Sequence, residues 1–358
     1  MMKDAAMVEP LTITAAAIQM DARLGDVTGN LERAERLVRA AFERGADWVL
    51  LPEFFTSAIG FHTALRQVAL PPDGAATRLL CDLARAHHGI VGGSFIAAEN
   101  GEAYNRFVLA GPEGVLGQHD KDQPTMWENA YYVGGSDDGI IATPLGAVGA
   151  AVCWELVRTR TARRLRGRVR LVVGGSCWWA TPDWPLARAL LRGPEAANCA
   201  IMRETPARFA RLTGAPLIHA SHCGRFVCAT PLLAYVSYPS HYLGEAQIAA
   251  ADGTVLARRI HEEGEGVALA RLALAPAAPV EPLPDRFWIP ELPLVARALW
   301  RYQNAHGARA YRRVRAARGF NWQQQGWERQ RAAPLAERPM PAARPVADTA
   351  PADRPPIP

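Results

Sequence analysis

Short apolar runs and helical apolar patterns alternate along most of this 358-residue chain. Residues 11–20 and 47–51 have the length and apolar content of strands, and between them apolar residues recur at helical spacing. We expect that helix to start with Asn30 as its N-cap and to end at Gly45. Five further strand-like runs follow, at residues 91–97, 107–110, 148–152, 171–175 and 217–220. This alternation predicts an α/β domain.

One cysteine stands at the end of a predicted strand. Cys153 follows a stretch of small and β-branched residues and precedes Trp154 and Glu155. A thiol at a strand end, beside an indole and a carboxylate, suits nucleophilic chemistry. A buried cysteine is also a common small hydrophobic residue. Its position alone therefore leaves both interpretations open.

Two charged residues also follow predicted strands. Glu53 lies between a proline and two phenylalanines, where burial would raise its pKa and make it a better proton acceptor. Lys121 lies between Asp120 and Asp122, and Glu128 is placed to fold back as its ion partner. The alternatives are a partly exposed loop carboxylate and a solvated surface lysine.

Taken together, these segments resemble the nitrilase superfamily of carbon–nitrogen hydrolases. The resemblance covers about residues 11 to 275. Its central motifs are Leu51–Phe54, Lys121 with Pro124-Thr125 and Glu128, and Val152–Glu155. The opening and closing segments of the family are matched by residues 17–20, 29–31, 244–248, 252–256 and 263–266.

The resemblance implies a four-layer α-β-β-α sandwich and a thiol-dependent hydrolase. It implies that Cys153 is the nucleophile, Glu53 the general base, Lys121 the cationic stabiliser and Glu128 a second carboxylate. It also implies that no metal or organic cofactor is needed. The expected partner is a small nitrile or amide substrate, and relatives commonly form homo-oligomers through their outer helices.

The bond that is cut is less well defined by the sequence. Lys121 with Pro-Thr and Glu128, together with Cys-Trp-Glu, resembles the nitrilase and cyanide-hydrolysing branch. The run around Glu53 resembles amidases instead, and residues 156–160 and 203–224 depart from typical nitrilases. We expect a nitrilase, with an amidase or N-carbamoyl amide hydrolase as the alternative. A catalytically silent interaction module of the same fold is a third possibility.

Aromatic residues near the predicted strand ends are candidates for substrate binding. Trp127, Trp154 and Trp178 would suit an apolar substituent. Asn129 is a candidate hydrogen-bond donor to the substrate, whereas Trp179 is better explained by core packing. His219 and His222 flank Cys223, but the chain lacks a ligand cluster with zinc-like spacing, so we predict no metal site.

Composition favours a soluble cytoplasmic protein. The six cysteines are too scattered for a disulfide scaffold, which favours a reducing compartment. The N-terminal residues lack the apolar core of a signal peptide, and the sequence has no membrane-length apolar run. The net charge of +5 is local, because 11 arginines and four acidic residues follow from position 301 onward. The rest is slightly acidic, so we expect no nucleic-acid partner.

The sequence divides into three parts. Residues 11–275 form the predicted hydrolase domain, and residues 276–331 a partly helical extension with a helix from Leu292 to Tyr311. Residues 332–358 are rich in proline, alanine and arginine, which predicts disorder. Apolar residues of the predicted helix favour packing or subunit contact, namely Leu292, Leu294, Val295, Leu299, Trp300 and Tyr302.

Overall fold

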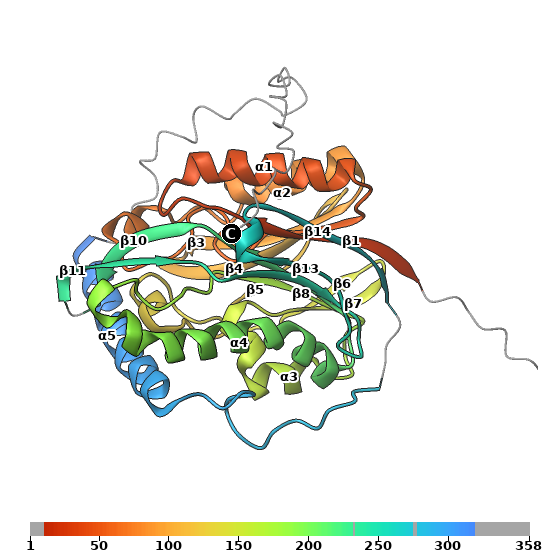
Figure 1. The fold of residues 1–358 in the computed structure, drawn as a ribbon. Helices are drawn as coiled ribbons and strands as arrows, with labels where there is room; N and C mark the ends of the chain where they lie inside the picture. Colours follow the sequence, from red (N-terminus) through yellow and green to blue (C-terminus); the bar gives the residue numbers. More distant parts are fainter. Residues whose placement is uncertain (1–10, 232, 275–277, 319–358) are drawn as a thin grey trace, which may run out of the picture. The chain divides into compact units, whose positions relative to one another are not determined.

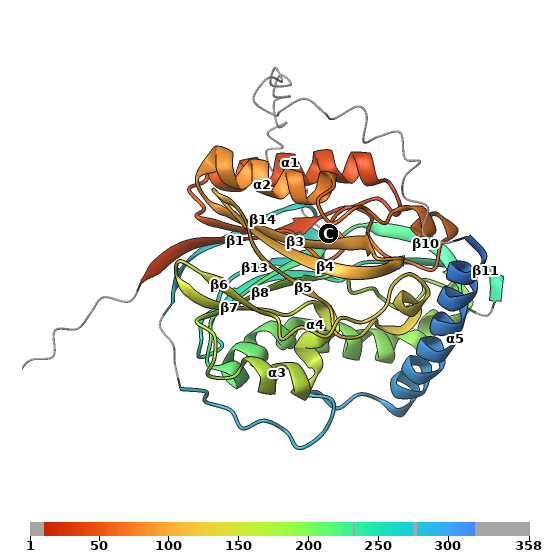
Figure 2. The same cartoon turned by 180° about the vertical axis from the view of Figure 1, so that it is seen from behind.

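Two layers of β-strands lie between two pairs of helices in the computed structural model, which describes residues 11–231, 233–274 and 278–318 (Figure 1). The predicted tail at 332–358 lies outside the described residues. Helices α1 (Val27–Glu43) and α2 (Ala75–His87) cover one outer face. Helices α3 (Thr159–Leu165) and α4 (Arg188–Thr213) cover the other, as the reverse view also shows (Figure 2). The four-layer α-β-β-α sandwich is therefore confirmed.

Within the described residues, each layer contains six strands. In order, the first is β5 (Gly114–Asp120), β4 (Glu102–Gly111), β3 (Ile90–Glu99), β2 (Trp48–Leu50), β1 (Thr12–Met20) and β14 (Gly266–Ala273). The second is β6 (Ile140–Thr143), β7 (Gly146–Ala150), β8 (Leu171–Ser176), β9 (Leu217–His222), β12 (Gly244–Ala249) and β13 (Val255–Ile260). The predicted strands are all present.

The two layers are joined rather than separate. The end of β1 pairs in parallel with the end of β9, at Gln19 with Ser221 and Met20 with His222. The twelve strands therefore form one hydrogen-bonded sheet that turns from one layer into the other. Strands β10 (Arg225–Thr230) and β11 (Leu233–His241) form a separate hairpin.

Small and aliphatic residues fill the space inside the sandwich. Residues such as Ala15, Leu50, Val173 and Ile218 are at most 1% exposed. Because aliphatic side chains favour burial, this core fixes how the strand ends of the two layers meet. Among the described residues, none of the helices is both long enough and apolar enough to cross a membrane.

The N-cap prediction for α1 is wrong. The helix begins at Val27, and the carboxylate of Asp26 accepts a hydrogen bond from the peptide nitrogen of Gly29 at 3.0 Å. Asn30 is buried within the first turns, where its amide binds the backbone of Arg23 and the carbonyl of Thr56. Asp26 is the better cap because its side chain reaches the free donors of the first turn.

The C-terminal helix α5 (Leu294–Arg318) starts two residues later than predicted and continues past Tyr311. Leu294, Leu299 and Tyr302, which we expected to serve in packing or subunit contact, are 75%, 47% and 42% exposed, so they are not part of the core of the chain. Trp300 does pack, against Phe287 and Trp288. The helix is held mainly by other residues on its inner face, as described below.

Candidate active site

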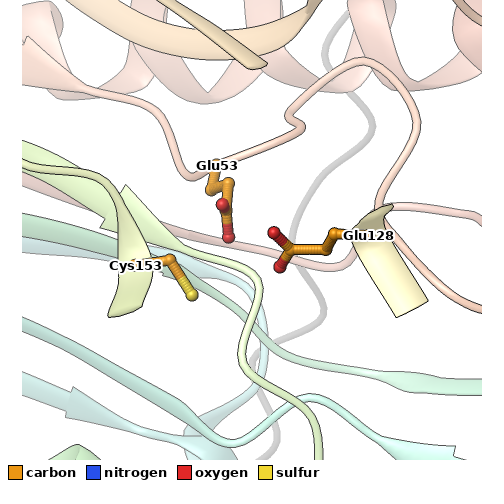
Figure 3. Close-up of side chains that lie close together, drawn as sticks. All are labelled: Glu53, Glu128 and Cys153. Carbon is orange, nitrogen blue, oxygen red and sulfur yellow. The ribbon is translucent and has the colours of Figure 1, made fainter. Parts of the chain in front are cut away.

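Four short turns carry the candidate residues. Glu53 follows β2, Lys121 follows β5 directly, and Cys153 begins the 3-10 turn η3 (Cys153–Val157) after β7. Glu128 lies in the 3-10 turn η2 (Met126–Ala130). Figure 3 shows Glu53, Glu128 and Cys153 pointing toward one another from separate segments. The sulfur of Cys153 and one oxygen of each carboxylate lie within 4.8 Å of one another.

The ammonium group of Lys121 lies between the two carboxylates. Its Nζ atom is 2.8 Å from Oε1 of Glu53 and 2.7 Å from Oε2 of Glu128. All four candidate side chains are at most 1% exposed. The ion partner expected for Lys121 is therefore in place, and the surface alternative for this lysine is wrong.

Four further groups donate hydrogen bonds to the carboxylates. The amide of Asn105 donates to Oε1 of Glu53 at 2.8 Å, and the peptide nitrogen of Cys177 donates to Oε2 at 2.9 Å. The hydroxyl of Tyr132 donates to Oε2 of Glu128, which also accepts from the peptide nitrogen of Thr125. Among the described residues, Oε1 of Glu128 has no hydrogen-bond partner.

Burial and charge give these groups unusual proton affinities. Burial raises the pKa of Glu53 to about 7, against the lowering effect of Lys121. Burial lowers the pKa of Lys121, but Glu128 and Glu53 outweigh it and raise that pKa well above its usual value. Burial, with the carboxylate of Glu53, raises the pKa of the Cys153 thiol well above its usual range. The resting pair is therefore a neutral thiol beside a carboxyl poised near neutrality.

Left-handed backbone conformations occur in these turns. Cys153 has φ +54°, Met126 φ +53° and Phe54 φ +54°. None of these is glycine, and such conformations cost of order 1–3 kcal/mol each. The strained residues therefore lie in the same turns as Glu53, Glu128 and Cys153.

Two adjacent glycines, Gly174 and Gly175, have a specific role in this arrangement. These glycines lie inside β8, and a Cβ atom on Gly175 would be 2.8 Å from Cα of Pro52 and 3.0 Å from N of Glu53. Only a glycine allows β8 to approach the backbone of Glu53 so closely.

The predicted pocket tryptophans form aromatic clusters beside the site. Trp154 lies 5.4 Å from both Trp178 and Trp288, measured between ring centroids. Trp127 stacks on Trp179 at 4.3 Å, and its indole nitrogen has no acceptor within the described part of the chain. Trp178 donates to Asn198. The aromatic residues are thus gathered around the turns that carry Glu128 and Cys153.

The side-chain amide of Asn129 already has hydrogen-bond partners within the protein. Its Nδ2 atom donates to the carbonyls of Pro124 and Met126 and to Oδ1 of Asn304. An amide NH₂ has only two hydrogens, so these contacts occupy it. In this arrangement Asn129 is a contact of α5 rather than a donor toward Cys153.

The two histidines near Cys223 are buried and uncharged. Burial lowers the pKa of both His219 and His222 to about 4. A ring nitrogen of His219 lies 2.8 Å from the hydroxyl of Ser176, and one of His222 lies 2.7 Å from the carbonyl oxygen of Glu53. His222 therefore supports the backbone of Glu53, a role that the sequence did not indicate.

Residues 14–281 match the carbon-nitrogen hydrolase family. The chain belongs to this family. Similar curated proteins include a nitrilase of Pyrococcus abyssi, 30% identical over 159 residues, which are 43% of this chain and 60% of that protein. An N-carbamoylputrescine amidase of Solanum lycopersicum is 31% identical over 167 residues, or 43% of this chain and 54% of that protein. These matches thus span about half of each relative.

Solved structures of low sequence identity have the same fold. An amidase from a Nesterenkonia species aligns with a TM-score of 0.58 and 21% identity, over 76% of this chain and 93% of that one. A carbon-nitrogen hydrolase from Helicobacter pylori aligns with a TM-score of 0.57 and 20% identity, over 74% and 89%. Helix α5 lies beyond the residues that match the family.

Proposed function

We propose that this protein is a thiol-dependent hydrolase of non-peptide carbon–nitrogen bonds, and that its preferred substrates are small nitriles. The observation that carries the proposal is the buried group of a thiol, two carboxylates and an ammonium, with sulfur and carboxylate oxygens within 4.8 Å. A structural core would rarely bury so many ionisable groups around one thiol.

Each residue has a chemical role in the proposed reaction. Glu53 accepts the proton of the Cys153 thiol, and the sulfur attacks the carbon of the substrate. With a nitrile, the triple bond becomes a C=N bond, and the nitrogen takes up the proton to form a thioimidate. Lys121 donates to the nitrogen, or to the oxygen of an amide, where negative charge develops.

Two waters complete the hydrolysis of a nitrile. The first adds to the thioimidate carbon, and the C–N bond breaks as the nitrogen leaves as ammonia, giving a thioester. Glu53 then accepts a proton from the second water, which breaks the C–S bond and releases the carboxylic acid. An amide needs only one water, because its first step already expels ammonia. Glu128 holds Lys121, and its second oxygen is available to the substrate.

The preference for nitriles rests on the run from Lys121 to Glu128 and on Cys153-Trp154-Glu155, and several similar curated proteins are nitrilases. An amidase or N-carbamoyl hydrolase is the second candidate. The similar N-carbamoylputrescine amidase and the deaminated glutathione amidase favour it, and the same four residues would serve either reaction.

Ammonia release from matched nitriles and amides tests the proposal. We expect turnover of nitriles by the wild-type protein and none by Cys153→Ala, whereas Cys81→Ala serves as a control thiol on α2. Turnover of amides or N-carbamoyl compounds alone would favour the second candidate. If no substrate reacts and Cys153 is alkylated no faster than the other thiols, the protein is a silent member of the fold.

A further inference from the structure

Helix α5 packs on the turn that carries Glu128, although it lies outside the family domain. Figures 1 and 2 show the helix across one end of the strand layers. Its residues Asn304, Gly307 and Tyr311 are three and four positions apart, so they share one helix face. Each of them contacts the domain.

Asn304 binds η2 directly. Its Oδ1 atom accepts from the peptide nitrogen of Met126 at 2.8 Å and from Nδ2 of Asn129 at 3.0 Å. The peptide nitrogen of Met126 belongs to the first residue of the turn, where a helical segment supplies no acceptor of its own. Asn304 supplies that acceptor from a residue 178 positions away.

Gly307 and Tyr311 fix how closely the helix approaches. A Cβ atom on Gly307 would be 2.7 Å from Cβ of Asn129 and 3.0 Å from N of Ala130, so a side chain there would push α5 away. Tyr311 is 3% exposed, and its hydroxyl accepts from the peptide nitrogen of Ala103 and donates to Glu102.

The turn needs such support because it is strained. Met126 has φ +53°, a conformation that persists only where the surroundings fix it. Glu128 lies two residues further on, with its carboxylate on Lys121. A small rotation of this turn would move that carboxylate away from the ammonium.

We propose that α5 is a positioning element of the active site, in which Asn304 fixes the η2 turn so that Glu128 meets Lys121. The kinetic part of this inference rests on the proposed hydrolase function, and the structural part does not. Asn304 acts through Met126 and Glu128, so it is a positioning residue rather than a catalytic one.

Displacement of Glu128 has a consequence for the proton affinity of Glu53. The charged and titratable groups that act on Glu53 are Lys121 at the end of β5, Glu128 and Tyr132 on the η2 side, Cys153 on η3 and Cys177 after β8. The charge of Glu128 raises the pKa of Glu53, and Lys121 lowers it. When Glu128 moves away, the charge of Lys121 is no longer opposed by that of Glu128, so the pKa of Glu53 falls. The acid limb of the pH profile, the range in which the rate falls as the pH drops, then shifts to lower pH.

The test uses the full chain with three variants. Asn304→Ala removes the acceptor, Asn304→Asp keeps an acceptor oxygen, and Arg309→Ala alters an exposed residue of the same helix. Three properties are measured: hydrogen exchange of residues 124–132, the pH dependence of Cys153 alkylation, and kcat and KM on the best substrate. Tyr311→Phe provides a second perturbation if Asn304→Ala does not fold.

We expect Asn304→Ala to speed exchange in residues 124–132 about tenfold, to lower kcat about tenfold with KM nearly unchanged, and to shift the acid limb to lower pH. Asn304→Asp and Arg309→Ala should resemble the wild type. Faster exchange with an unchanged acid limb and kcat would overturn the positioning role. If the wild type hydrolyses no substrate, the proposed function fails. The role of α5 is then decided by the hydrogen-exchange rates and by the pH dependence of Cys153 alkylation.

Discussion

His119 and Glu155 form a fully buried ion pair behind the candidate nucleophile, with 2.9 Å between Nε2 of the imidazole and Oε2 of the carboxylate. The same carboxylate accepts from the peptide nitrogen of Val152, just before Cys153, and from that of Asp122, just after Lys121. Glu155 therefore links the two segments that carry the thiol and the ammonium. These contacts make Glu155 a framework residue of the site.

Stability should depend on this pair in alkaline solution. Burial lowers the pKa of His119, but Glu155 and Asp137 outweigh it and raise that pKa to about 10. Because the folded pKa lies above the unfolded value, the stabilisation is complete below about pH 6.5 and is lost as the pH rises toward 10. We expect the free energy of unfolding to fall over this range, by up to about 1.4 kcal/mol per pH unit.

Denaturation at several pH values measures this loss. His119→Gln removes the fully buried cation beside Glu155 and leaves Arg164, 3.6 Å from Oε1, as the ion partner. We therefore expect a loss of up to about 3–5 kcal/mol at pH 6.5 and a flatter alkaline dependence. Arg168→Ala removes an exposed ion pair with Asp138 and should cost at most about 1 kcal/mol. An equal alkaline slope in the wild type and His119→Gln would contradict the assignment.

The proposed base predicts the pH dependence of turnover. Glu53 accepts a proton only when ionised, and its pKa is about 7, so kcat/KM should fall as the pH drops through about 7. Because Glu53 and Cys153 interact, the measured value belongs to the pair.

Glu53→Gln should lower kcat by about 100-fold or more, whereas Glu113→Gln on the exposed β4–β5 turn should not. Steady-state rates from pH 5 to 9 decide this. An acid limb near pH 4.5, typical of an unperturbed glutamate, would be inconsistent with the buried site.

The sequence predicted the parts of this site that are local. Glu53, Lys121 and Cys153 each lie within three residues of the end of a strand, and the periodicity of those strands is readable from a few neighbours. The partners of these residues come from elsewhere: Asn105 is 52 positions from Glu53, and Cys177 is 124 positions away. Contacts of this kind depend on how the layers stack, which no local pattern encodes.

His119 offered a weak local signal. It lies two residues before Lys121, so both would face the same side of a strand, and both prove to be buried. The exposed leucines of helix α5 do not hold it to the domain. The docking depends instead on a small residue, Gly307, and on the polar groups of Asn304 and Tyr311.

Close approach of β8 to Glu53 predicts that one added methyl group is costly. Gly175→Ala places an atom 2.8 Å from Cα of Pro52, so Glu53 must move, and we expect a loss of about 1–3 kcal/mol with a large fall in kcat. Gly193→Ala is the matched control, since its Cβ meets nothing within 4 Å and alanine favours the helix. Melting and turnover of both variants test this, and equal turnover would contradict the packing argument.

The charge of Glu128 and its hydrogen bonds can be separated by two variants. Glu128→Gln keeps an oxygen for the peptide nitrogen of Thr125 but removes the negative charge beside Lys121. Because that charge raises the pKa of Glu53, its removal should shift the acid limb to lower pH and reduce kcat about 100-fold, with a small change in KM. Tyr132→Phe removes one neutral donor to Glu128 and should cost tenfold or less, with the acid limb in place. Rates against pH for both variants make the comparison. If Tyr132→Phe shifts the acid limb as far as Glu128→Gln does, the pKa of Glu53 is controlled by the packing around the Glu128 carboxylate and not by its charge.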